Sequence, residues 1–182
     1  MRQENQASIV QWADETFGPA TSVARVVVRA YEEFVELLRA HTSGKPLVDV
    51  CMEAADVTIV LFRAAEMRQA DLLAEAYEAR KCLSNGNPLE VAHGHMTMLV
   101  RSVVWSDPDI WPMAHEMGSI VAALGRFVDE RHVNVGLSLR ELVNRKMEIN
   151  RARQWRTDGT GHGYHTRVDG EAAIPLHQFA RG

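Results

Sequence analysis

The feature that most constrains the fold is a turn signal placed midway between two acidic clusters. The turn is Thr42-Ser43-Gly44-Lys45-Pro46. Its glycine favours the end of one helix, and its proline prevents that helix from continuing. Glu32-Glu33-x-x-Glu36 precedes the turn, and Glu53-x-x-Asp56 follows it at the mirror-image distance. The sequence therefore predicts a helical hairpin that brings the two acidic clusters to the same level.

Within each cluster the acidic residues lie three apart, so they share one helix face. Four carboxylates are expected to meet in one patch, and partly buried anions at such separations repel one another unless a counter-charge is present. Hard divalent cations take oxygen ligands. The pattern makes the following residues candidate ligands for Mg²⁺, with Mn²⁺ as a substitute: Glu33, Glu36, Glu53 and Asp56. The competing interpretation is that these carboxylates belong to a solvent-exposed charged helix face, as charge runs on helices usually do. Glu32 in particular fits that interpretation.

Hydrophobic periodicity along the rest of the chain predicts an all-α fold without a β-hairpin. Residues 1–156 are expected to form one domain, followed by a Gly- and His-containing tail over 157–182 that acts as a loop or strap. Ser84-Asn85-Gly86-Asn87-Pro88 marks a clear break. The expected helices cover 6–17, a stretch from a cap at Thr21 or Ser22 to the turn, 47–83, 89–105, a stretch from Asp107-Pro108-Asp109 to about His132, and a last one from Gly136 and Ser138 to about Arg156.

Composition limits the partners of the chain. The net charge of −4 over 182 residues predicts no general attraction to nucleic acid or to an anionic membrane. No apolar run approaches the roughly 18 residues that span a bilayer, and the N-terminus lacks the apolar core of a signal peptide. Cys51 and Cys82 are isolated, which favours reduced thiols and a cytoplasmic location. The glycine-rich loops of the usual nucleotide-binding folds are missing.

The last predicted helix carries cations on a face that should point inward. Leu142, Lys146, Ile149 and Arg153 follow steps of four, three and four, and Asn150 lies beside the two cations. An unpaired buried charge is costly, so this row requires an anionic partner. Two partners fit: the acidic patch itself, or a phosphate chain bridged to the patch by a metal ion. Cationic side chains that extend to solvent remain the simpler interpretation.

Together these residues resemble a family signature. E-E-x-x-E, 16 residues, E-x-x-D and a later K-x-x-x-N-x-x-R are similar to the motifs of the MazG-like all-α nucleoside triphosphate pyrophosphohydrolases. The run from Asn150 to Trp155, continued by Asp158-Gly159-Thr160-Gly161-His162-Gly163-Tyr164-His165, resembles the dATP/dGTP pyrophosphohydrolase (phage MazZ-like) branch. The segment 84–110 has no counterpart in a minimal MazG-like domain.

The resemblance implies hydrolysis of purine deoxynucleoside triphosphates, dGTP or dATP, between the α and β phosphates. It also implies a homodimer or homotetramer and, in a phage, supply of dGMP for modified-base synthesis within the host cytoplasm. By the same resemblance, Glu32 orients or activates water. The remaining implied roles are Mg²⁺ ligands (Glu33, Glu36, Glu53, Asp56), phosphate-chain ligands (Lys146, Asn150, Arg153, with Lys146 also catalytic) and groups that stack on the base or close over substrate (Trp155, His162, Tyr164).

Two alternatives stay open on the sequence. A MazG-like enzyme of another specificity, for dUTP or dCTP, carries the same acidic motif. A non-enzymatic helical interaction protein can use the acidic hairpin to bind a basic partner. The first differs in its nucleotide preference, and the second shows no dependence on metal.

Overall fold

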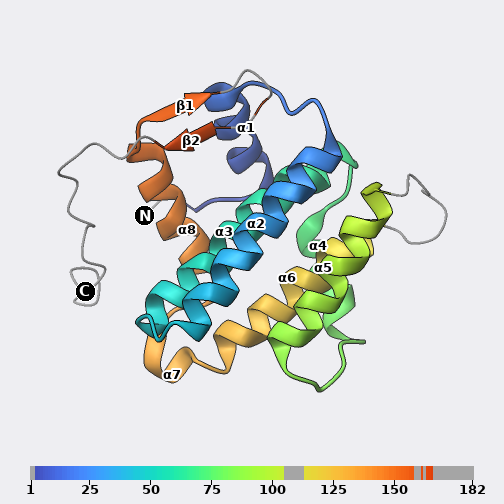
Figure 1. Cartoon of the computed structure of the whole chain (residues 1–182), viewed down its shortest axis with the longest axis vertical. Helices are drawn as coiled ribbons and strands as arrows, with labels where there is room; N and C mark the ends of the chain where they lie inside the picture. The colour runs from blue at the N-terminus through green and yellow to red at the C-terminus, as the bar shows by residue number, and fades with distance from the viewer. Residues whose placement is uncertain (1–2, 105–112, 158–160, 162, 166–182) are drawn as a thin grey trace.

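The computed structural model describes residues 3–104, 113–157, 161 and 163–165. The described chain is mostly helical, which confirms the predicted all-α class, and two short strands follow the last helix (Figure 1). The elements are α1 Gln6–Phe17, α2 Val23–Thr42, α3 Leu47–Met67, α4 Leu72–Arg80, α5 Pro88–Val104, α6 Met113–Asp129, α7 His132–Val135, α8 Leu139–Ala152, β1 Trp155–Thr157 and β2 Gly163–His165.

Helices α2 and α3 form the predicted antiparallel hairpin at the centre of the molecule (Figure 1). Ser43 is the C-cap of α2, Gly44 adopts a left-handed φ of 72°, and Pro46 is the N-cap of α3. Phe34 and Leu37 on α2 are fully buried, as is the apolar side of α3. Burying each large apolar side chain contributes about 1.5–3 kcal/mol, so this seam fixes the hairpin and with it the level of the acidic residues.

The hairpin lies between two groups of helices (Figure 1). Helices α1 and α8 pack against α3, while α5 packs against α2 and, with α4, against α6. Gly118 of α6 permits a close approach of α4, because a Cβ there would lie 2.6 Å from the backbone of Glu75 in α4. Helix α5 therefore helps to bury the side of α2 that it contacts.

The prediction of one helix over residues 47–83 is wrong. Helix α3 stops at Met67, and Gln69 adopts a left-handed φ of 56°. Asp71 then caps α4, its side chain accepting hydrogen bonds from the backbone of Leu73 and Ala74. A cap of this kind competes with helix continuation, and neither glycine nor proline marks the break.

The end of the chain also differs from the prediction. Helix α8 ends at Ala152 rather than Arg156, because Arg153 takes an extended backbone with ψ of 152°. Strands β1 and β2 then pair antiparallel, with Arg156 opposite Tyr164. The expected absence of a β-hairpin is therefore wrong. This pairing crosses the boundary expected at residue 157.

Most other boundaries are confirmed. Helices α1 and α5 occupy the predicted stretches, Ser22 caps α2, and Ser138 caps α8 in a reciprocal capping box with Glu141. The helix start predicted at 107–109 lies outside the described residues. Helix α7 was not predicted. Among the described helices, none combines the length and the apolar character that a membrane crossing requires.

Candidate metal centre

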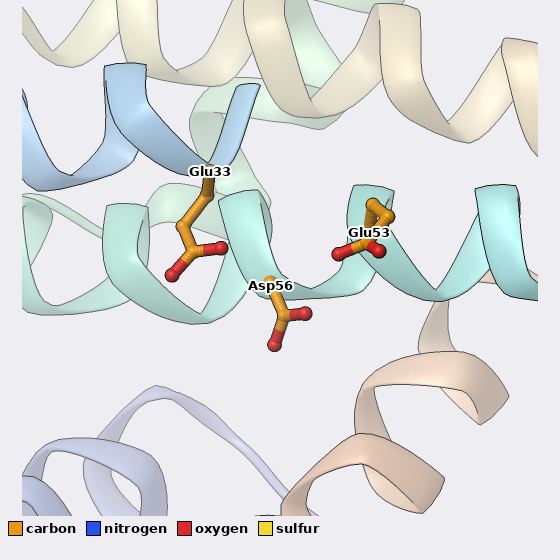
Figure 2. A group of neighbouring side chains, drawn as sticks. All are labelled: Glu33, Glu53 and Asp56. Atoms are coloured by element: carbon orange, nitrogen blue, oxygen red, sulfur yellow. The ribbon is translucent and has the colours of Figure 1, made fainter. Parts of the chain in front are cut away.

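Three of the four predicted ligands converge in the middle of the hairpin. Glu33 projects from α2, and Glu53 and Asp56 project from successive turns of α3 (Figure 2). One carboxylate oxygen of each lies within 4.8 Å of the others. We refer to Glu33, Glu53 and Asp56 as the acidic triad. Its oxygen-only donor set fits a hard divalent cation such as Mg²⁺ or Mn²⁺.

The surroundings of the acidic triad disfavour its ionised form. Burial, followed by the charge of Asp56, raises the pKa of Glu33 to about 7. Burial and the same neighbouring charge also raise the pKa of Glu53. Burial raises the pKa of Asp56, although Lys146 opposes the shift. Three carboxylates in these positions gain strongly from a positive charge placed among them.

Each carboxylate of the acidic triad forms an ion pair with a different cation. Glu33 pairs with Arg29 one turn earlier in α2. Asp56 pairs with Lys146 of α8. Glu53 lies 3.7 Å from the Nζ atom of Lys45, which belongs to the turn between α2 and α3. The three cations thus approach from a helix, a turn and a second helix.

The predicted cationic row of α8 does face inward. The Lys146 side chain is only 13% exposed, and Asn150 is buried. Arg153 donates from Nη1 to Asn150 Oδ1 at 3.3 Å, and its charge helps to hold down the pKa of Asp56. Lys146 therefore occupies the place that the sequence predicted for the counter-charge of the acidic patch.

Glu32 and Glu36 lie outside the acidic triad. The Glu32 side chain is 55% exposed and accepts a hydrogen bond from Arg29 at 3.0 Å. Glu36 is exposed, although its charge contributes to the raised pKa of Glu33 and Glu53. Three residues turn a helix by 300°, so Glu36 is rotated by 60° from Glu33. The same three-residue step separates Glu53 from Asp56, which do converge, so the spacing alone does not decide which carboxylates meet.

Trp155, the first residue of β1, packs against two aromatic side chains of α1. Trp155 contacts the rings of Trp12 and Phe17 edge-on, with centroids 5.9 and 5.1 Å away. Its Nε1 donates to the carbonyl of Asn150 at 2.8 Å. These contacts hold the start of β1 against α1 and the end of α8. His162 lies outside the described residues, and of Tyr164 only the backbone in β2 is described.

Sequence reasoning missed Arg29 and Lys45. Arg29 precedes Glu33 by four residues, a spacing that favours a helical ion pair and was a usable signal. Lys45 was interpreted only as part of the turn. Nothing in its spacing singles out Glu53 as its partner, because that contact depends on the backbone path of the turn.

Comparisons of the chain with protein-family models, with curated proteins and with solved structures find no match. Function must therefore be argued from the residues of the site.

Proposed function

We propose that the protein is a Mg²⁺-dependent nucleoside triphosphate pyrophosphohydrolase. The observation that carries the proposal is the convergence of the acidic triad with the inward cations of α8. A triphosphate is a polyanion, and carboxylates admit it only with divalent metal between them. The site combines partly buried carboxylates, which can bind the metal, with an adjacent lysine and arginine, which can bind the phosphates.

The residues of the chain divide the work. Glu33, Glu53 and Asp56 would hold the metal ion, which supplies Lewis-acid polarisation of a phosphoryl group and a more acidic water. Lys146 and Arg153 would bind the phosphate chain and offset the charge that develops on the departing pyrophosphate. Asn150 holds the guanidinium of Arg153 in position.

Glu32 and Glu36 complete this assignment at the solvent side of α2. Both are exposed, so either carboxylate is accessible to a water molecule that approaches the metal. Glu32 would accept the proton of that water. Glu36 would bind the metal ion through water, because its carboxylate lies outside the acidic triad.

The substrate class follows from the sequence resemblance. It favours dGTP and dATP, with the product dNMP released beside pyrophosphate, and a cytoplasmic location. In a phage the reaction would supply dGMP for modified-base synthesis. Preference for dUTP or dCTP is the alternative specificity, and the same nucleotide panel distinguishes the two.

A homodimer or homotetramer belongs to the same proposal. Val28 and Tyr31 are exposed apolar residues of α2, and they lie on the same helix as Glu32. Exposed apolar surface beside a charged rim is typical of an interface. Sedimentation equilibrium is expected to give a mass of two or four chains, and Tyr31→Glu is expected to shift it toward one chain.

The decisive test is pyrophosphate release from dGTP, dATP, dCTP, dTTP and dUTP, each with and without Mg²⁺. We expect Mg²⁺-dependent release that is fastest with a purine nucleotide. Glu53→Gln removes one charged ligand and is expected to reduce the rate by on the order of 100-fold. Glu78→Gln is the matched control, because Glu78 is exposed and pairs with Lys81 on α4. No turnover of any nucleotide by folded protein contradicts the proposal and favours the acidic hairpin as a binding surface.

A further inference from the structure

Each carboxylate of the acidic triad already has a cationic partner. Three carboxylates face three cations: Arg29, Lys45 and Lys146. A metal ion that binds alone is repelled by these cations, and a polyanion that binds alone is repelled by the carboxylates. Each ligand alone therefore binds more weakly than it would at unpaired charges, because its favourable partner is already in an ion pair.

Binding of both ligands together changes this balance. A divalent cation that binds the carboxylates deprives Lys45 and Lys146 of their partners, and it leaves Arg29 paired with Glu32 alone. Lys146 is only 13% exposed, so an unpaired charge at that position is costly. Phosphate oxygens are the natural replacement, since arginine and lysine form charge-assisted hydrogen bonds with them. The exchange restores a counter-charge on both sides.

Arg29 and Lys45 are placed for such an exchange. Figure 2 shows Glu33 and Glu53 on opposite sides of Asp56. Their partners Arg29 and Lys45 therefore lie at opposite ends of the acidic triad. Both cations keep access to solvent, with side chains 42% and 53% exposed. A bound chain of several phosphates has length enough to meet more than one of them.

We propose that Arg29 and Lys45 are polyphosphate-binding residues that exchange their carboxylate partners for phosphate when a divalent cation binds, and that they thereby couple the binding of metal and substrate. This inference rests on the proposed function for the metal and for the class of ligand. It adds two residues that the sequence motif does not contain. By linkage, the coupling is reciprocal: each ligand tightens the binding of the other by the same factor.

The test uses Mg²⁺ and inorganic tripolyphosphate as probes and isothermal titration calorimetry as readout, so it needs no turnover of a nucleotide. In the wild-type protein, tripolyphosphate is expected to bind far more tightly with Mg²⁺ than without it. Lys45→Met is expected to change the affinities for the two ligands in opposite directions. It tightens binding of Mg²⁺ alone by about 3- to 10-fold, and it weakens binding of tripolyphosphate in Mg²⁺ by a similar factor.

Two further variants sharpen the result. Arg29→Lys retains a charge but loses the forked contact with Glu32 and Glu33, so it is expected to weaken tripolyphosphate binding by about 3-fold without unfolding the protein. Lys81→Met is the matched control, because Lys81 pairs with an exposed Glu78 on α4. It is expected to change neither affinity.

The outcomes separate the two proposals. If Lys45→Met leaves tripolyphosphate affinity in Mg²⁺ unchanged, the exchange is overturned even where nucleotide hydrolysis is found. If tripolyphosphate and Mg²⁺ show the opposite shifts in Lys45→Met but no nucleotide is hydrolysed, the exchange stands and the proposed hydrolysis falls. Equal affinity for tripolyphosphate with and without Mg²⁺ also overturns the inference.

Discussion

At the scale of the residue, the raised pKa of Glu33 links the acidic triad to the stability of the fold. The Glu33 side chain is 10% exposed, and its pKa is raised to about 7 by burial and by Asp56. The unfolded chain gives a glutamate its ordinary pKa of about 4.3. The folded protein therefore binds more protons than the unfolded chain between these two values.

This difference predicts how the stability of the metal-free protein depends on pH. Because the folded state holds the extra proton, the free energy of unfolding falls as pH rises from about 4.5 to about 7, by on the order of 2–3 kcal/mol from Glu33. Urea unfolding in EDTA at pH 5 and pH 8 measures the change. Glu33→Gln is expected to flatten the dependence, and an unchanged slope in this variant contradicts the assignment.

Magnesium is expected to offset this fall in the free energy of unfolding. A divalent cation stabilises the ionised carboxylates, so its binding releases protons from the acidic triad near pH 6–7. Calorimetry in two buffers with different ionisation enthalpies measures the number of protons released. No proton release by the wild-type protein is inconsistent with binding at Glu33.

At the scale of the element, two glycines of α6 differ in what surrounds them. A Cβ on Gly118 would lie 2.6 Å from the backbone of Glu75, whereas a Cβ on Gly125 would meet nothing within 4 Å. Gly118→Ala is expected to destabilise the protein by about 1–3 kcal/mol, because α4 must move away from α6. Gly125→Ala is expected to stabilise the protein by up to about 1 kcal/mol, since alanine is the better helix former. Thermal unfolding of the two variants measures both signs, and a shift in the same direction for both contradicts this packing.

The sequence was a good guide to elements that its own pattern defines. The hairpin of α2 and α3 follows from one turn and two apolar stripes, and the inward row of α8 follows from helical spacing. The break after Met67 depends on a left-handed Gln69 and on the cap made by Asp71. No run of glycine or proline announced these local choices, so the periodicity alone continued the helix.

The acidic site was predictable in part for the same reason. Mirror-image spacing placed Glu33, Glu53 and Asp56 at one level. It did not distinguish the buried Glu33 from the exposed Glu36. The contact between Lys45 and Glu53 depends on the path of the turn in three dimensions. Pairing across helices is thus readable from spacing, whereas the direction of each side chain requires the backbone.

At the scale of the whole molecule, Arg63 joins parts of the chain that are distant in sequence. Its buried guanidinium donates to the carbonyls of Gly18 and Gly161 and to Asp14 Oδ1, the last at 2.8 Å. Gly161 adopts φ of 84°, and a Cβ there would lie 2.6 Å from the carbonyl of Pro19. One side chain of α3 therefore contacts both the end of α1 and Gly161, which lies between β1 and β2 in the sequence.

Removing this contact is expected to loosen the C-terminal strands before the rest of the fold. Arg63→Met leaves Gly161 without its donor, so trypsin is expected to cleave after Arg156 about 10-fold faster, because local opening sets the cleavage rate. Mass spectrometry of a digestion time course measures the site and the rate. Arg80→Met is the control, because Arg80 forms an exposed ion pair with Asp129. The two side chains are 66% and 46% exposed. Equal cleavage rates in the wild-type protein and in Arg63→Met contradict this role.

The distance in sequence between α3 and α8 has a consequence for synthesis. The hairpin that carries the acidic triad is complete at Met67, and α8 begins at Leu139. At about 5–20 residues per second, several seconds separate the emergence of the two from the ribosome. During that interval Lys146 does not yet exist, but Arg29 and Lys45 emerge with the hairpin itself. The nascent hairpin therefore contains the ion-pair partners of Glu33 and Glu53, whereas Asp56 has its partner only after α8 has been synthesised.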